Sequence, residues 1–165
     1  CVKGPNVMLG YYMPENPGVL VPPQDGWYHT GDVVDIDEIG FFTIKDRIKR
    51  FAKIGGEMVS LNAVQDMVIA AANTDESAGY SYGVVAIPHE SKGEQIVLVT
   101  NNREITSSVL HAYVKANGMS ELYLPRIILY HEKLPVFATG KADNVTLKKE
   151  VLAELNAALE TDKAA

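Results

Sequence analysis

The segment Leu134-Pro135-Val136-Phe137-Ala138-Thr139-Gly140-Lys141 ends in a lysine whose position suits anion chemistry. A lysine directly after a Thr-Gly pair lies on a mobile turn, and its side chain can bring a compact positive charge to a small anionic target. A solvated surface turn would explain the same residues. A functional role becomes the better explanation when the segment is considered together with two others, Trp27 to Asp32 and Asp46 to Val59.

The triplet Thr30-Gly31-Asp32 combines a hydroxyl, a flexible glycine and a carboxylate. A carboxylate that faces a sugar accepts hydrogen bonds from two neighbouring hydroxyls at once, and nucleotide-binding folds use an acidic residue on ribose in this way. Arg47 is a candidate second donor to the same hydroxyls. The alternative is a turn in which Asp32 caps its own backbone, with Arg47 as a solvated basic residue.

Paired glycines, Gly55-Gly56, follow a run of basic and apolar residues. They permit positive φ angles and a close approach of a ligand or another chain to the backbone, although a plain turn needs no further explanation. The four histidines show no metal-ligand spacing, and a single cysteine makes a zinc site improbable. The sequence also lacks a glycine-rich phosphate loop of the GxxxxGK[ST] kind.

The elements that position these residues fall into two unequal parts. Residues 1 to about 45 are rich in glycine, proline and tyrosine, and turn signals separate short β-prone runs at 33–36 and 40–44. This stretch has few large apolar residues to bury and is expected to be the edge of another domain. The boundary is placed after residue 48, so that residues 49–165 form the second domain.

The second part has an alternating α and β pattern. Helices are expected at 61–71, 107–116 and 145–159, and strands at 83–87, 95–99 and 126–130. Ser60 and Thr106 are the candidate N-caps of the first two helices. In the last helix, one face carries Leu147, Val151, Leu155 and Leu159. The simplest way to bury these faces is an α+β fold, a small three-stranded sheet covered by helices.

Composition limits the class of protein. The chain has 165 residues, of which 47% are hydrophobic, enough for a core, and its net charge of −6 argues against a nucleic-acid binder. The only cysteine is Cys1, so an intrachain disulfide is impossible and a reducing, cytoplasmic setting is expected. No apolar run approaches the ~18 residues of a membrane helix. The first residue is not methionine, and we expect a fragment of a longer protein.

Taken in order, the three segments resemble the C-terminal part of the adenylate-forming enzymes, which include acyl-CoA synthetases, peptide-synthetase adenylation domains and luciferases. The opening run Lys3 to Tyr12 is similar to the stretch that precedes the Thr-Gly-Asp motif of that family. The narrower run Lys49 to Leu61 most resembles the bifunctional 2-acylglycerophosphoethanolamine acyltransferase/acyl-[acyl-carrier-protein] synthetases. The resemblance implies that residues 49–165 are a C-terminal lid domain and residues 1–48 the β-rich end of the N-terminal adenylating domain.

The resemblance also implies roles for individual residues. Asp32 would bind the ribose hydroxyls of ATP and of the acyl-adenylate, with Arg47 assisting. Lys49 would be the hinge about which the lid rotates, and Gly56 would let a pantetheine arm pass close to the backbone. Lys141 would bridge the acyl carboxylate and the phosphate during adenylation. Mg²⁺ is expected in the longer enzyme, with no ligands identified in this chain.

Several positions depart from the family pattern, namely Asp46, Ala63, Phe137 and the run Ala142-Asp143-Asn144. Asp46 stands where a glycine is usual, and its carboxylate could compete for the charge of Arg47. The residues that carry the implied roles are nevertheless all present, so the departures do not indicate loss of function.

The implied activity is an ATP-dependent fatty-acid ligase that forms acyl-AMP and passes the acyl group to acyl carrier protein and then to a lysophospholipid. The chain alone is expected to be inactive. Docking of an acidic carrier would use basic residues, with Lys45, Lys49, Arg50 and Lys53 as candidates. An ordinary acyl-CoA synthetase and a non-catalytic carrier-binding module are the alternatives. The longer protein would be cytoplasmic, with attachment to the cytoplasmic face of the inner membrane left open.

Overall fold

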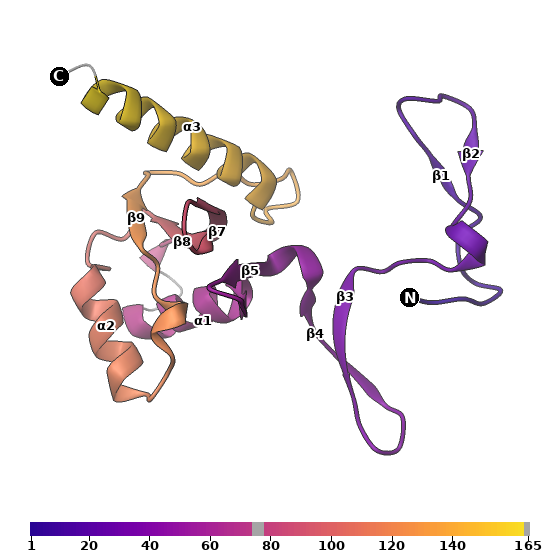
Figure 1. Cartoon of the computed structure of the whole chain (residues 1–165), viewed down its shortest axis with the longest axis horizontal. Coiled ribbons are helices and arrows are strands. Elements are labelled where there is room, and N and C mark those ends of the chain that lie inside the picture. The colour runs from indigo at the N-terminus through magenta and orange to yellow at the C-terminus, as the bar shows by residue number, and fades with distance from the viewer. Residues whose placement is uncertain (74–77, 164–165) are drawn as a thin grey trace. The chain divides into compact units, whose positions relative to one another are not determined.

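The computed structural model describes residues 1–73 and 78–163. The chain forms two compact units, Cys1–Lys49 and Arg50–Ala165 (Figure 1). The first unit contains small β-ribbons, and the second contains a mixed sheet with three helices. The α+β class that the sequence predicts is therefore confirmed.

Two antiparallel ribbons make up the first unit. In the shorter one, β1 (Tyr11–Tyr12) pairs with β2 (Leu20–Val21). In the longer one, β3 (Asp32–Ile36) pairs with β4 (Phe42–Arg47), with a register shift between Val33 and Val34. The Asp37 carboxylate closes the β3–β4 turn, because its Oδ1 accepts hydrogen bonds from the backbone N–H of Ile39 and Phe41 at 3.1 and 2.8 Å.

The first unit has an apolar face without a core. Val34 lies opposite Ile44, and Ile36 lies opposite Phe42, so these four side chains share one face of the β3–β4 ribbon. Phe42 is 67% exposed and Ile44 is 61% exposed. Within residues 1–49, all of which are described, no hydrophobic side chain is buried. A two-stranded ribbon of this kind is marginally stable at best by itself.

The second unit is built on a five-stranded sheet, in which β8 (Gly93–Thr100) is central. One edge of β8 pairs along its length with β7 (Tyr82–His89) in an antiparallel ladder. The other edge is shared by two strands: β5 (Phe51–Ile54) pairs at Gly93, and β9 (Ile127–Tyr130) runs parallel to residues 97–100. The strand β6 (Glu57–Ser60) pairs with β5.

Alternation along β7 and β8 creates two apolar layers. Val84, Ala86, Ile96 and Leu98 face α1 (Leu61–Ala72) and α2 (Ser107–Ala116), whereas Val85, Ile87, Val97 and Val99 face α3 (Asn144–Lys163). The helices therefore cover both faces of the sheet, with α3 on the opposite side from α1 and α2 (Figure 1). Both predicted N-caps form, since Ser60 Oγ accepts from Ala63 N at 3.1 Å and Thr106 Oγ1 accepts from Val109 N at 3.4 Å.

The sheet exceeds the three strands that the sequence predicts because Gly55-Gly56 is the turn of a hairpin. Both glycines have positive φ, +60° and +96°, which suits a tight two-residue connection. The flanking strands β5 and β6 bury Ala52, Ile54 and Val59 on the face toward α1. A glycine pair between two four-residue alternating runs is the local signal for this hairpin.

The last helix is longer than predicted, and its apolar stripe is only partly buried. Leu147 and Val151 are buried at 2% and 0% exposure, but Leu159 is 60% exposed. The sequence-based assignment of Leu159 to the buried face is therefore wrong. The helical period continues, but Leu159 lines an open pocket with Ile87 and Pro88 of β7 instead of packing into the core.

Candidate functional site

Asp32 and Arg47 meet at the ends of the β3–β4 ribbon, where the ladder pairs them directly. Arg47 Nε lies 2.7 Å from Asp32 Oδ1, and Arg47 Nη1 donates to the Thr30 carbonyl at 3.3 Å. The Asp32 side chain is 18% exposed, and that of Arg47 is 68% exposed. A carboxylate and a guanidinium thus stand together at an accessible edge, as a site for vicinal hydroxyls requires.

The loop before β3 fixes the orientation of this pair. Thr30 Oγ1 accepts a hydrogen bond from Asp32 N at 3.2 Å, and the Gly31 carbonyl accepts from Ile48 N at 2.8 Å. Gly31 has a φ of +73°, a conformation that favours glycine. The local cap therefore comes from the threonine hydroxyl, and the Asp32 carboxylate turns to Arg47 rather than to its own backbone.

Asp46 is buried at 6% exposure beside the pair. Its Oδ1 accepts a hydrogen bond of 2.7 Å from the backbone N–H of Arg47. The Arg47 guanidinium is directed to Asp32 and Thr30 instead. The Asp46 carboxylate thus contacts the backbone of Arg47, and the Arg47 guanidinium contacts Asp32 and Thr30.

Lys49 is the last residue of the first unit, and Arg50 is the first residue of the second. The Arg50 guanidinium is held by its own unit: it donates to Asn62 Oδ1 at 2.8 Å, to the Val84 carbonyl at 2.8 Å and to Gln65 Oε1 at 3.2 Å. Arg50 was expected to contribute to a basic docking surface. The structure gives it an internal role, because a planar guanidinium satisfies three acceptors on α1 and β7 at once.

The Lys141 loop is a closed, hydrogen-bonded structure. Phe137 N donates to the Lys141 carbonyl at 2.8 Å, Gly140 N donates to the Phe137 carbonyl at 2.8 Å, and Val136 forms a β-bridge with Ala142. The Lys141 side chain is exposed and contacts no acceptor among the described residues. The turn that the sequence suggested is thus a small hairpin, in which Lys141 directly follows the turn at residues 137–140.

Asp143 joins this hairpin to α3. Its backbone N–H donates to the Pro135 carbonyl at 2.9 Å, and its Oδ1 accepts from the N–H groups of Thr146 and Val145 at 3.0 and 3.1 Å. The Thr146 hydroxyl donates to Oδ2 at 2.7 Å. The backbone and hydroxyl hydrogen bonds from Thr146 lower the pKa of Asp143 from its ordinary value of 3.8. Asp143 therefore acts as the N-cap that connects Lys141 to a helix.

We expect Asp143→Ala to destabilise the chain at neutral pH. The difference in stability from wild type should become smaller as the pH falls. Because the folded pKa is lowered, the contribution is present above the unfolded value of 3.8 and is lost as the pH falls through the folded value. Denaturant midpoints of both proteins, measured from pH 7 down to pH ~3, will check this expectation. Asp66→Ala, at an exposed position on α1, is the control. A gap between wild type and Asp143→Ala that is constant with pH would contradict it.

Within the second unit, the glycine turn and the Lys141 loop are fixed to opposite ends of β7. Gly55 N donates to the Lys92 carbonyl at 2.9 Å, beside the β7–β8 connection. At the other end, a Cβ on Gly83 would lie 2.9 Å from Leu134 Cδ2, so the start of the Lys141 loop packs against the first residues of β7. The seven residues from Gly83 to His89 span about 20 Å of strand.

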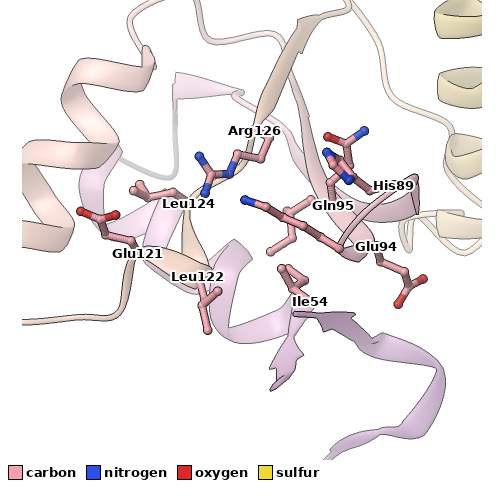
Figure 2. A pocket seen from close by; sticks show the side chains of 10 residues that line it. Ile54, His89, Glu94, Gln95, Glu121, Leu122, Leu124 and Arg126 are labelled. Carbon is pink, nitrogen blue, oxygen red and sulfur yellow. The ribbon is translucent and has the colours of Figure 1, made fainter. Parts of the chain in front are cut away.

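A cavity of about 200 Å³ lies beside the glycine turn. It is lined by Ile54, His89, Lys92, Glu94, Gln95, Ile96, Glu121, Leu122, Leu124 and Arg126. Figure 2 shows Glu121, Leu122 and Leu124, from η4 (Glu121–Tyr123) and its C-cap, on one side and His89, Glu94 and Gln95 on the other. Lys92 and Arg126 make the cavity attractive to an anionic group. The local sequence does not predict that these two cations line one cavity, because they are brought together by the pairing of β8 with β9.

Among the described residues, no group of three or more His, Cys, Asp or Glu side chains is arranged to hold a metal ion. No helix in the described part of the chain is long and apolar enough to cross a membrane.

No family model matches the chain, but individual proteins do. It is 33% identical over 153 residues to a long-chain-fatty-acid–CoA ligase of Salmonella typhimurium, covering 91% of this chain and 26% of the relative. A medium-chain fatty-acid–CoA ligase of Escherichia coli is 27% identical over 157 residues, covering 93% of this chain and 27% of the relative. The chain thus spans about a quarter of the length of the curated relatives it matches.

Solved structures agree. A fatty acyl CoA synthetase of Mycobacterium tuberculosis superposes with a TM-score of 0.58 at 27% identity, over 79% of this chain and 25% of that one. The ATP-bound MatB of Rhodopseudomonas palustris gives a TM-score of 0.60 at 21% identity, over 78% of this chain and 25% of that one, and shows the fold alone. Sequence and fold together place the chain in the C-terminal region of the adenylate-forming acyl-CoA synthetase superfamily.

Proposed function

We propose that the chain is the C-terminal part of an ATP-dependent fatty acid–CoA ligase, with residues 1–48 belonging to the large adenylating domain and residues 49–165 forming its lid. The observation that carries the proposal is the placement of two functional segments at opposite ends of one strand: the Gly55-Gly56 turn beside Lys92, and the Lys141 loop beside Gly83. One rigid unit can then present a different end to each of two half-reactions.

In the first half-reaction, a carboxylate oxygen of the fatty acid attacks the α-phosphorus of ATP, and pyrophosphate leaves. Two anions must approach each other, and the exposed Lys141, on a hydrogen-bonded hairpin, would place its ammonium group between them. Asp32 accepts hydrogen bonds from the ribose hydroxyls, and Arg47, held at 2.7 Å, orients that carboxylate and donates to the same hydroxyls.

In the second half-reaction, a thiolate attacks the acyl carbonyl, and AMP leaves. Lys141 must withdraw and a path for the thiol must open. Rotation about Lys49, the residue at which the two units divide, would exchange the Lys141 end of the lid for the Gly56 end. At that end, a Cβ on Gly55 or Gly56 would meet no atom of the described chain within 4 Å, so the backbone is open to a narrow acceptor arm.

Coenzyme A is the acceptor that we favour over a carrier protein. The relatives are named as fatty-acid–CoA ligases, and Lys92 and Arg126 line the cavity beside the glycine turn. Two carboxylates, those of Glu94 and Glu121, line the same cavity, and the Glu94 carboxylate is held by Lys53 N at 2.7 Å. Phosphates next to a pantetheine arm fit this arrangement.

We expect Lys92→Ala and Arg126→Ala in the full-length enzyme each to raise the KM for CoA about tenfold, since a hydrogen bond to a charged group contributes about 1.5–3 kcal/mol. The KM for ATP should stay within about twofold of wild type, because the Asp32–Arg47 pair is intact. Lys115→Ala, at an exposed position on α2, is the matched control. Unchanged CoA kinetics in both variants would exclude the cavity as the CoA site.

Transfer to acyl carrier protein, and from there to a lysophospholipid, is the second candidate. It rests on the resemblance of the run Lys49 to Leu61 to the bifunctional synthetases, and on exposed lysines at 45, 49 and 53. Parallel assays of the full-length enzyme with CoA and with acyl carrier protein separate the two candidates. Acylation of the carrier with no acyl-CoA product would overturn the CoA assignment. Activity with neither acceptor, and no fatty-acid-dependent pyrophosphate exchange, would instead favour a non-catalytic carrier-binding module.

A further inference from the structure

The Gly55-Gly56 turn has little packing to hold it in place. A Cβ built on either glycine meets nothing within 4 Å among the described residues, so no neighbouring side chain supports the tip of the turn. The hairpin β5–β6 joins the rest of the sheet through a single residue pair, Ile54 with Gly93. Ala52, Ile54 and Val59 anchor the two strands in the core, so the hydrogen bonds between β5 and β8 act mainly on the position of the tip.

Two hydrogen bonds reinforce the Ile54–Gly93 pair. The first is a backbone bond of 2.9 Å from Gly55 N to the Lys92 carbonyl. The second is unusual for a sheet, because the acceptor for Lys53 N is a side chain: Glu94 Oε2 lies 2.7 Å from that nitrogen. The carboxylate takes the place of a ladder carbonyl, and charge-assisted hydrogen bonds of this length are among the stronger ones in proteins.

Gly93 allows the two strands to approach closely. It has a φ of +81°, and a Cβ at this position would lie 3.0 Å from the Lys53 carbonyl oxygen. A side chain there would push β5 away from β8. The sequence Lys92-Gly93-Glu94 thus supplies a backbone acceptor, a position without a side chain and a carboxylate acceptor in three consecutive residues.

We propose that Glu94 is a positioning residue for the thiol half-reaction: its carboxylate holds the Gly55-Gly56 turn against the β7–β8 hairpin and so sets the opening through which the acceptor thiol enters. The proposal rests on the function proposed above. It adds that Glu94 affects the thiol half-reaction alone, because the Lys141 loop is fixed at the far end of β7 and does not depend on Glu94.

The test compares Glu94→Ala with Glu94→Gln in the full-length enzyme, with Glu90→Ala as the matched control in the same hairpin connection, where the residue is exposed. Glu94→Ala should raise the KM for the thiol acceptor about tenfold, because small misplacements of a site are costly. Fatty-acid-dependent pyrophosphate exchange should stay within about twofold of wild type. Glu94→Gln keeps an acceptor oxygen and should recover part of the loss.

Amide hydrogen exchange of the chain gives a readout that does not depend on the ligase activity. Exchange at Lys53 and Gly55 should be about tenfold faster in Glu94→Ala and near wild type in Glu94→Gln, because the hydrogen bond to Lys53 N is lost in the first and kept in the second. Unchanged exchange would overturn the structural role of Glu94.

Two further outcomes are distinguishable. Faster exchange with an unchanged KM for the thiol, or an equal loss in both half-reactions, would overturn the positioning role while leaving the proposed function intact. Absence of ligase activity in the wild-type full-length enzyme would overturn the proposed function, and the positioning role with it.

Discussion

Replacing Lys141 by alanine in the full-length enzyme is expected to lower the rate of adenylation about 10²–10³-fold, which corresponds to about 3–4 kcal/mol of transition-state stabilisation. The physical reason is the meeting of two anions, the fatty-acid carboxylate and the α-phosphate. A cation between them offsets a repulsion that grows as the new bond forms. The geometry supports this expectation, since Lys141 is exposed on a closed hairpin and its side chain contacts no competing acceptor among the described residues.

The second half-reaction should be spared in this variant. Thioester formation from preformed acyl-adenylate does not need Lys141, so its rate should remain within about threefold of wild type. Fatty-acid-dependent pyrophosphate exchange and acyl transfer from synthetic acyl-adenylate measure the two steps separately. Lys133→Ala, an exposed lysine in the same connection between β9 and α3, is the control. Normal pyrophosphate exchange in Lys141→Ala would refute the assignment.

Asp32→Ala should have the second-largest effect and a different signature. The ribose is common to ATP and to the acyl-adenylate, so both half-reactions should weaken. A hydrogen bond to a charged group contributes about 1.5–3 kcal/mol. Because Asp32→Ala removes the charged acceptor for the ribose hydroxyls, the KM for ATP should rise about 10–100-fold. The variant also leaves Arg47 without the carboxylate that holds it at 2.7 Å.

Asp35→Ala is the control for this prediction. Asp35 lies on the same strand, and its 3.6 Å ion pair with Lys45 is exposed to solvent, so its removal should cost at most about 1 kcal/mol of stability. Steady-state kinetics with varied ATP, together with acyl transfer from preformed acyl-adenylate, provide the measurement. A loss confined to one half-reaction would contradict a ribose-binding role for Asp32.

The three site variants should therefore differ in pattern as well as in size. Lys141→Ala impairs the first half-reaction, Glu94→Ala the second, and Asp32→Ala both. These patterns follow from position, because the Lys141 loop and the Glu94 contact lie at opposite ends of β7.

Local features of the fold could be predicted from the sequence. Ser60 and Thr106 are N-caps, and the apolar runs at 83–87 and 95–99 are strands, because capping and alternation depend on residues close to one another in the chain. The sequence also contains the local signal for the Gly55-Gly56 hairpin. A reading of the glycine pair as a site of close ligand approach omits the two strands β5 and β6 from the predicted sheet. The exposure of Leu159 could not be predicted from the sequence, because the apolar spacing of the helix continues to residues that do not pack into the core.

The resemblance to adenylate-forming enzymes follows from residue types and their order along the chain, namely Asp32, Arg47, Lys49, Gly56 and Lys141. Which of these groups meet depends on the fold. It turned Arg47 toward Asp32, held Arg50 on α1 and β7, and brought Glu94 to Lys53, a contact across 41 positions of the chain. These contacts depend on which strand edges pair, and that pairing follows from burying an apolar layer on each face of one sheet, a condition on the whole unit and not on any local run.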